Sequence, residues 1–187
     1  MNETLKVIEK RSTCRSYNGQ MPPQEMLEAI AKAAVQAPSA LNGQPWRVIV
    51  VKNKALIDEI ENDVLRIMKA MADQTGYQRI MSRGGKPFYN TPCMIFVPFD
   101  PKAFRGGAFD CGIIIQNIAL AAASLGLDNC ICASAGTALM GDRGSEFKAK
   151  LGFPEGYEYG LAVMVGYGAA APASPHEPDM AKISYID

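Results

Sequence analysis

The segment from residue 108 to residue 125 constrains the fold of this chain more than any other. It is rich in isoleucine and alanine, fits a helix, and carries almost no charge beyond Asp110. A helix without a polar face must be covered on nearly all sides. Its alanines also allow close approach by another helix, either from the same chain or, at a dimer seam, from a second copy. Layers from the rest of the chain or from a second copy must therefore cover it.

Short apolar runs alternate with helical patterns along the rest of the chain, and neither internal repeats nor linkers interrupt them. The apolar runs predict buried strands at residues 48–51, 93–99, 130–133 and 159–167. Further helices are expected around residues 5–8 and at 24–37, 54–72 and 146–151. Residues 73–92 are expected to form a helix tail and an exposed loop, and residues 182–186 a strand-like tail. The alternation predicts a single three-layer α/β or α+β domain over residues 1–187.

The composition excludes several classes of partner. Nineteen basic and nineteen acidic residues balance to a formal net charge of zero, so neither nucleic acid nor a membrane surface is an expected partner. No apolar tract approaches the ~20 residues that span a bilayer. The N-terminal residues lack the apolar core of a signal peptide, so we expect a cytoplasmic protein.

The cysteines and the histidine argue against a metal site. The five cysteines contain no Cys-x-x-Cys pair and lie in apolar surroundings, which is typical of small core residues in a reducing compartment. His176 is the single histidine. We therefore expect no bound metal.

The connection between the second helix and the first strand carries more polar groups than a simple connector requires. Pro38 and Ser39 end the helix, and Asn42 and Gln44 follow just before Trp46, the single tryptophan. Loops on a rigid scaffold are where binding groups concentrate. This loop is a candidate for part of a binding site, with Trp46 more suited to anchoring it in the core.

The segment from Arg11 to Arg15 is the best candidate for binding an anion. Two guanidinium groups and two hydroxyls can donate to phosphate oxygens, and arginine does so in a fixed fork. The alternative is a solvated surface loop. No glycine-rich dinucleotide motif, nucleophile elbow or carboxylate pair is present. The residues favour binding of a phosphorylated, partly apolar ligand that supplies the reactive group itself.

Three blocks in order, at residues 11–17, 37–51 and 110–127, carry a family resemblance. They read R-S-T-x-R-x-Y, A-P-S-A-x-N-x-Q-P-W-x-x-x-V-V and D-x-G-x-x-x-Q-N-x-x-L-A-A-x-x-L-G-L. Together they resemble the FMN-dependent nitroreductase family over almost the whole chain. The resemblance implies an α+β fold with a mixed, mainly antiparallel sheet wrapped by helices. It also implies an intertwined homodimer with two FMN molecules at the interface.

The resemblance also implies a chemistry. NADH or NADPH reduces the flavin, which then reduces a small-molecule electron acceptor such as a nitroaromatic or a quinone, in ping-pong alternation. No side chain is required as a catalytic acid or base, since the flavin carries the chemistry. The helix at 108–125 would be the dimer helix, and the tail at about 170–187 would extend onto the partner subunit.

Carried over by position, Arg11, Ser12, Thr13 and Arg15 would hold the FMN phosphate and ribityl chain. Lys86 would lie near the pyrimidine end of the flavin ring, where a cation stabilises the anionic reduced flavin.

Two further groups complete the implied site. Pro38, Ser39 and Asn42 would reach the flavin from the partner subunit. The backbone at Ala133 and Ser134 would offer amide groups near flavin N5.

The chain departs from the family pattern in three places. Many members have arginine where Ser12 stands, and a C-terminal basic residue is replaced here by His176. Both changes favour weaker FMN binding. The segment between the second strand and the central helix is short, so any lid must come from residues 66–90. These departures keep two alternatives open: a non-catalytic flavin-binding or redox-sensing protein, and a specialised reductase such as a reductive dehalogenase.

Overall fold

The computed structural model describes residues 1–104, 107–171 and 174–186. Four strands form one sheet in the order β1-β2-β4-β3. They are β1 (Ile49–Val51), β2 (Cys93–Phe99), β3 (Asp128–Cys132) and β4 (Glu158–Gly166). All three strand pairs are antiparallel. β1 and β3 therefore occupy opposite edges of the sheet.

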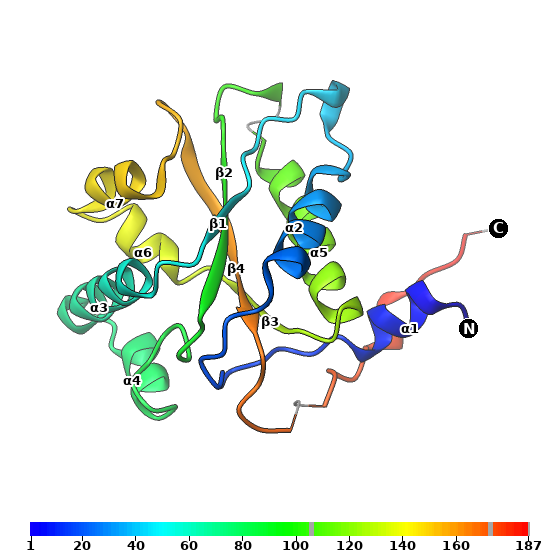
Figure 1. The fold of residues 1–187 in the computed structure, drawn as a ribbon, viewed down its shortest axis with the longest axis horizontal. Coiled ribbons are helices and arrows are strands. Elements are labelled where there is room, and N and C mark those ends of the chain that lie inside the picture. Colours follow the sequence, from blue (N-terminus) through cyan, green and yellow to red (C-terminus); the bar gives the residue numbers. More distant parts are fainter. Residues whose placement is uncertain (105–106, 172–173, 187) are drawn as a thin grey trace.

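Helices cover both faces of the sheet (Figure 1). One face is covered by α2 (Gln24–Val35) and α5 (Ala108–Ser124), and the other by α3 (Lys54–Ala70), α6 (Ala135–Leu139) and α7 (Gly144–Leu151). The short helices α1 (Glu3–Lys10) and α4 (Thr75–Met81) lie at the periphery. The described residues also include the 3-10 helices η1 (Ala40–Asn42), between α2 and β1, and η3 (Met180–Lys182), after β4. The predicted three-layer α+β fold is confirmed.

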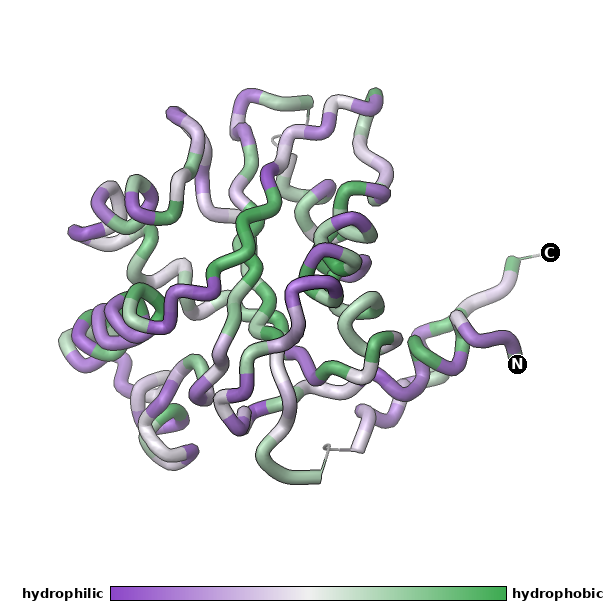
Figure 2. Tube along the Cα trace, viewed as in Figure 1, coloured by the Kyte–Doolittle hydropathy of each residue, from purple (hydrophilic) through white to green (hydrophobic). Residues whose placement is uncertain are grey.

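The alternation of side chains along β2 and β4 divides the core into two clusters. Met94, Phe96 and Met164 pack with α3, α6 and α7, whereas Ile95 and Val163 pack with α2 and α5. Successive side chains of a strand point to opposite faces, so a strand buried on both faces is apolar throughout. In Figure 2 hydrophobic residues follow the central strands, and many hydrophilic residues lie on the outer helices.

Three expectations about local structure need correction. Residues 73–92 contain the separate helix α4, and α6 directly follows β3 where no helix was expected. Residues 183–186 form no strand in this single chain, in which η3 precedes them. Ile183 has extended backbone angles, but a segment is part of a sheet only when a neighbouring strand pairs with it.

α5 is less covered than its sequence predicts. Its inner face is fully buried, but Phe109 is 76% exposed and Ile113 41% exposed. The sheet, α2 and α1 pack against α5, and among the described residues they leave these two side chains exposed. The prediction of burial all round is therefore wrong for the single chain. Among the described residues, no helix combines the length and apolar character needed to cross a membrane.

Candidate functional site

The Arg11–Arg15 segment runs along the free edge of β3. Thr13 forms an isolated parallel bridge with Asn129, and the Cys14 N–H donates to the Asn129 carbonyl at 2.9 Å. This segment follows α1 directly and passes below the sheet in Figure 1. The bridge fixes four of the predicted site residues, Arg11, Ser12, Thr13 and Arg15, along one strand edge.

The two arginines keep their charge available. In the described part of the chain no carboxylate pairs with either guanidinium group, and Arg11 donates only to the Ser12 carbonyl, at 3.0 Å. Burial raises the pKa of the Cys130 thiol to about 12, and the charges of Arg15 and Arg11 act against that rise. Both positive charges therefore act on the same residue of β3, Cys130. This donor set fits a phosphate group.

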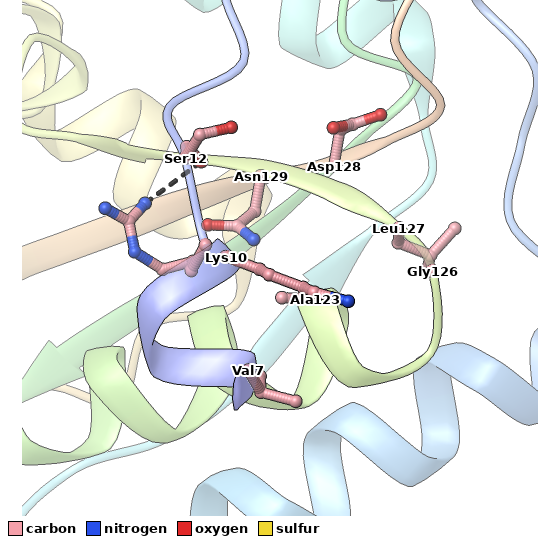
Figure 3. Close-up of a pocket in the computed structure, with 9 residues that line it drawn as sticks. Val7, Lys10, Ser12, Ala123, Gly126, Leu127, Asp128 and Asn129 are labelled. Carbon is pink, nitrogen blue, oxygen red and sulfur yellow. Dashed lines mark hydrogen bonds between the residues drawn. The ribbon is translucent and has the colours of Figure 1, made fainter. Parts of the chain in front are cut away.

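A pocket of about 310 Å³ adjoins this segment at the start of β3 (Figure 3). Its walls come from the end of α1, the Arg11–Ser12 step and the corner between α5 and β3. The Lys10 side chain extends across it toward Ala123, and Ser12 and Asp128 lie on the other side. Asn129 is 1% exposed and donates to the Ala119 carbonyl at 3.1 Å, while its side-chain oxygen has no protein partner. This oxygen is buried, so it does not by itself offer an acceptor to a ligand in the pocket.

The turn at residues 86–91 is fastened to the same segment. The Tyr17 N–H donates to the Tyr89 carbonyl at 3.1 Å, and the Asn90 side chain donates to the Tyr17 carbonyl at 3.4 Å. Tyr89 and Asn90 have φ angles of 52° and 61°, a left-handed conformation that is costly for residues other than glycine. Lys86 is exposed at the start of this turn. The tertiary structure therefore ties the turn that carries Lys86 to the chain segment that follows Arg15.

The far end of β3 completes this arrangement. Ala133 is exposed, and Ser134 is the residue before α6, with its hydroxyl 3.3 Å from the Cys132 sulfur. The Tyr159 hydroxyl donates to the Cys132 carbonyl at 2.5 Å and fixes the strand end. Ser134 comes five positions after Asn129, a span of about 17 Å along an extended chain. The Arg11–Arg15 segment, Lys86 and Ala133–Ser134 are called the β3-edge half-site from here on.

Ile131 is a further candidate that the sequence did not indicate. It lies on β3 between the two ends of the β3-edge half-site and is 41% exposed, although its neighbours Cys130 and Cys132 are buried. The run Cys130–Cys132 reads as a strand buried on both faces. The exposure of Ile131 depends on the position of β3 at the sheet edge, and the local sequence pattern does not show that position.

Pro38, Ser39 and Asn42, called the loop half-site, lie elsewhere. Their loop runs over the start of α5, where the Ala40 N–H donates to Asp110 at 3.2 Å, and it leads to β1 at the opposite sheet edge (Figure 1). One chain therefore does not bring the two half-sites together.

The loop half-site is strained and largely satisfies its own polar groups. Leu41, Asn42 and Gln44 have φ angles of 54°, 51° and 46°. The Ser39 hydroxyl accepts from the Gln44 N–H at 2.9 Å, and the Gln44 side chain donates to Asn42 at 3.1 Å. Strain of this kind concentrates at functional sites. Trp46 is 5% exposed, which confirms that it anchors the loop in the core.

His176 stands apart from both half-sites. It is exposed in the irregular C-terminal segment, and no hydrogen bond or ion pair joins it to the Arg11–Arg15 segment within the described ranges. Across the same residues, no cluster of histidine, cysteine, aspartate or glutamate could hold a metal ion.

Comparison with known proteins identifies the family to which the chain belongs. The family model described as the nitroreductase family matches residues 8–167. The crystal structure of a nitroreductase with bound FMN from Desulfitobacterium hafniense is 52% identical, covers 100% of both chains and superposes with a TM-score of 0.97.

Two curated relatives are also similar. An Archaeoglobus fulgidus protein, provisionally named NADH dehydrogenase/NAD(P)H nitroreductase, is 30% identical over 89% of this chain and 86% of its own length. Iodotyrosine deiodinase of Thermotoga neapolitana is 33% identical over 41% of this chain and 39% of its own length. The family match and the architecture agree, and this chain belongs to the nitroreductase family.

Proposed function

We propose that this protein is a cytoplasmic, FMN-dependent oxidoreductase. It takes electrons from NADH or NADPH and passes them to a nitroaromatic, a quinone or a related small acceptor. It works as a homodimer with FMN at the interface, each FMN held by the β3-edge half-site of one subunit and the loop half-site of the other.

The observation that carries this proposal is the β3-edge half-site itself. Two guanidinium groups, which pair with no carboxylate of the described residues, lie beside two hydroxyls along β3. The ring end of the half-site combines the backbone of Ala133–Ser134 with the lysine Lys86. A ligand with an anionic phosphate at one end and a polar ring at the other matches this order of groups. FMN has this form, and it is bound in the solved relative with 52% identity.

Within this arrangement, Arg11, Ser12, Thr13 and Arg15 would hold the phosphate and the ribityl chain. Bound FMN would supply the hydride acceptance and donation. Ile131 and the backbone of Ala133–Ser134 would form the protein side of the ring and exclude water from it. The Lys86 ammonium would favour negative charge on the ring, which is electrostatic stabilisation by a fixed group. Protons can come from solvent, so no side chain has to titrate.

The exposed side of α5 supports the dimer. Phe109 and Ile113 leave apolar surface uncovered on this helix, and a second copy of the same helix would cover it symmetrically. Such a dimer would also bring the loop half-site of each subunit, which overlies the start of α5, to the other subunit. The tail from residue 170 onward would add to this contact.

Purification of the intact protein tests the proposal. We expect a yellow preparation that releases FMN on denaturation and oxidises NADH or NADPH only when a nitroaromatic or quinone acceptor is present. A colourless protein that does not take up added FMN would refute the proposal.

A flavin-binding protein without turnover is the second candidate. It is favoured by Ser12, a weaker phosphate donor than arginine, and by His176, which forms no hydrogen bond or ion pair with the Arg11–Arg15 segment in the described residues. Full FMN occupancy without acceptor-dependent NAD(P)H oxidation would select this function. Turnover confined to halogenated phenols would instead select reductive dehalogenation, the activity named in the deiodinase relative.

A further inference from the structure

Glu61 is a buried carboxylate behind the β3-edge half-site. It projects from α3, is 5% exposed, and accepts a hydrogen bond from the Phe88 N–H at 2.6 Å. A carboxylate removed from water is costly unless it is hydrogen-bonded or paired with a charge. The other buried positions of α3 are mostly aliphatic. The contacts of Glu61 must therefore explain why a carboxylate occupies this one.

The contact is with the turn that carries Lys86. This turn contains the two left-handed residues Tyr89 and Asn90, so it must be held by its surroundings. Tyr17 fastens it from the side of Arg15 through the two hydrogen bonds already described. Glu61 fastens it from the side of α3, at Phe88, which is 1% exposed. The position of Lys86, two residues earlier, therefore depends on Glu61.

The charge of Glu61 also acts on Lys86 and on the end of β3, the two parts of the half-site proposed to bind the flavin ring. Burial raises the pKa of Glu61, and the Phe88 N–H and the Lys86 charge act in the opposite direction. Burial likewise raises the pKa of Cys132, and the negative charge of Glu61 adds to that rise. The carboxylate is thus close to Lys86 and to the end of β3 that leads to Ala133 and Ser134.

We propose that Glu61 is a positioning residue for the flavin-ring end of the site, which holds the Lys86 turn in place and offsets part of the Lys86 charge. This inference rests on the proposed function. Reduction adds negative charge to the ring region, and a nearby carboxylate disfavours it. Glu61 therefore lowers the reduction potential of bound FMN while it secures the group that raises it.

Glu61→Gln separates charge from hydrogen bonding, because glutamine retains an oxygen acceptor for the Phe88 N–H. The matched control is Glu59→Gln on the same helix, since Glu59 pairs with Arg143 and Lys150 on the outer surface. Reductive titration of the FMN-loaded dimers gives the midpoint potential. We expect a more positive potential for Glu61→Gln and an unchanged potential for Glu59→Gln. Wild-type potential in the FMN-loaded Glu61→Gln protein would overturn the charge role.

Glu61→Asp tests the positioning role and covers the case in which Glu61→Gln fails to fold. It keeps the charge but shortens the side chain, so the turn loses its contact. We expect FMN and riboflavin affinities to fall equally, by about tenfold, because the ring end and not the phosphate end is disturbed. Wild-type affinity for both ligands would overturn the positioning role. A wild-type protein that binds neither ligand would refute the proposed function, and this inference with it.

Discussion

The β3-edge half-site and the loop half-site differ in what holds them and in what they can offer a ligand. The first is hydrogen-bonded to a strand of the central sheet, and no carboxylate of the described residues pairs with its two guanidinium groups. The second is a strained loop without charge, in which the Ser39 hydroxyl and the Asn42 amide oxygen both accept hydrogen bonds from Gln44. The first can supply most of the affinity for an anionic ligand. The second can add shape and orientation once its loop is in place.

The largest expected effect comes from removing both charges of the β3-edge half-site. Arg11→Gln combined with Arg15→Gln should weaken FMN binding at least about 100-fold, because each charge-assisted hydrogen bond contributes roughly 1.5–3 kcal/mol. Riboflavin, which lacks the phosphate, should bind almost as before. Fluorescence titration with both ligands measures this, and Arg47→Gln, whose guanidinium lies over Tyr157, is the control. An equal loss for both ligands would show that the arginines do not recognise the phosphate.

Mixed dimers test whether the two half-sites meet across subunits. One subunit carries Arg11→Gln and Arg15→Gln, and the other carries Asn42→Ala. In a composite site the mixed dimer combines all defects at one site and leaves the other intact, so we expect one tightly bound FMN per dimer. FMN content of dimers purified with two different tags gives the stoichiometry. Two weakened sites per mixed dimer would place both half-sites within one subunit.

Asn42→Ala alone should weaken FMN binding by about tenfold, as expected for loss of one or two hydrogen bonds. The left-handed φ of 51° at this position complicates the alanine variant. Asn42→Gly removes the amide without strain and is the matched control. Ser39→Ala also removes the acceptor for Gln44 and should therefore disturb the loop as well as the site. Equal FMN binding in wild type and Asn42→Gly would remove Asn42 from the site.

The smallest effect concerns a region remote from both half-sites, the ion-pair network between α3 and α7. Hydrogen bonds from Arg143 and then Lys150 lower the pKa of Glu146 to about 2. A carboxylate with a lowered folded-state pKa stabilises the fold above its ordinary pKa, and this contribution is lost as the pH falls toward 2.

Glu146→Gln should therefore lower the melting temperature slightly near neutral pH, with a difference that shrinks in acid and at high salt. FMN affinity should not change. Thermal melts over a pH series test this, and a changed affinity would mean that the network is coupled to the half-sites.

Most residues of the proposed site could be named from the sequence because its motifs are local. The Arg11–Arg15 segment and the loop half-site are each contiguous, so their donors can be recognised without a fold. Lys86 could be placed only through the resemblance, and it is the hydrogen bonds between Tyr17 and residues 89–90 that tie its turn to the segment after Arg15. Glu61 and Ile131 could not be found, because an acidic residue on a helix and an apolar residue in a strand are ordinary in sequence.

By itself, the sequence determined the layered α+β fold, the buried strands and the candidate anion-binding segment, since each depends on periodicity or on neighbouring residues. Only the tertiary structure decided which strand forms an edge, how the Lys86 turn is held and where the two half-sites lie relative to one another. Those features depend on contacts between residues far apart in the chain, such as Thr13 with Asn129 and Glu61 with Phe88. Hydrophobic patterning fixes which face of an element is buried, but packing determines which elements meet.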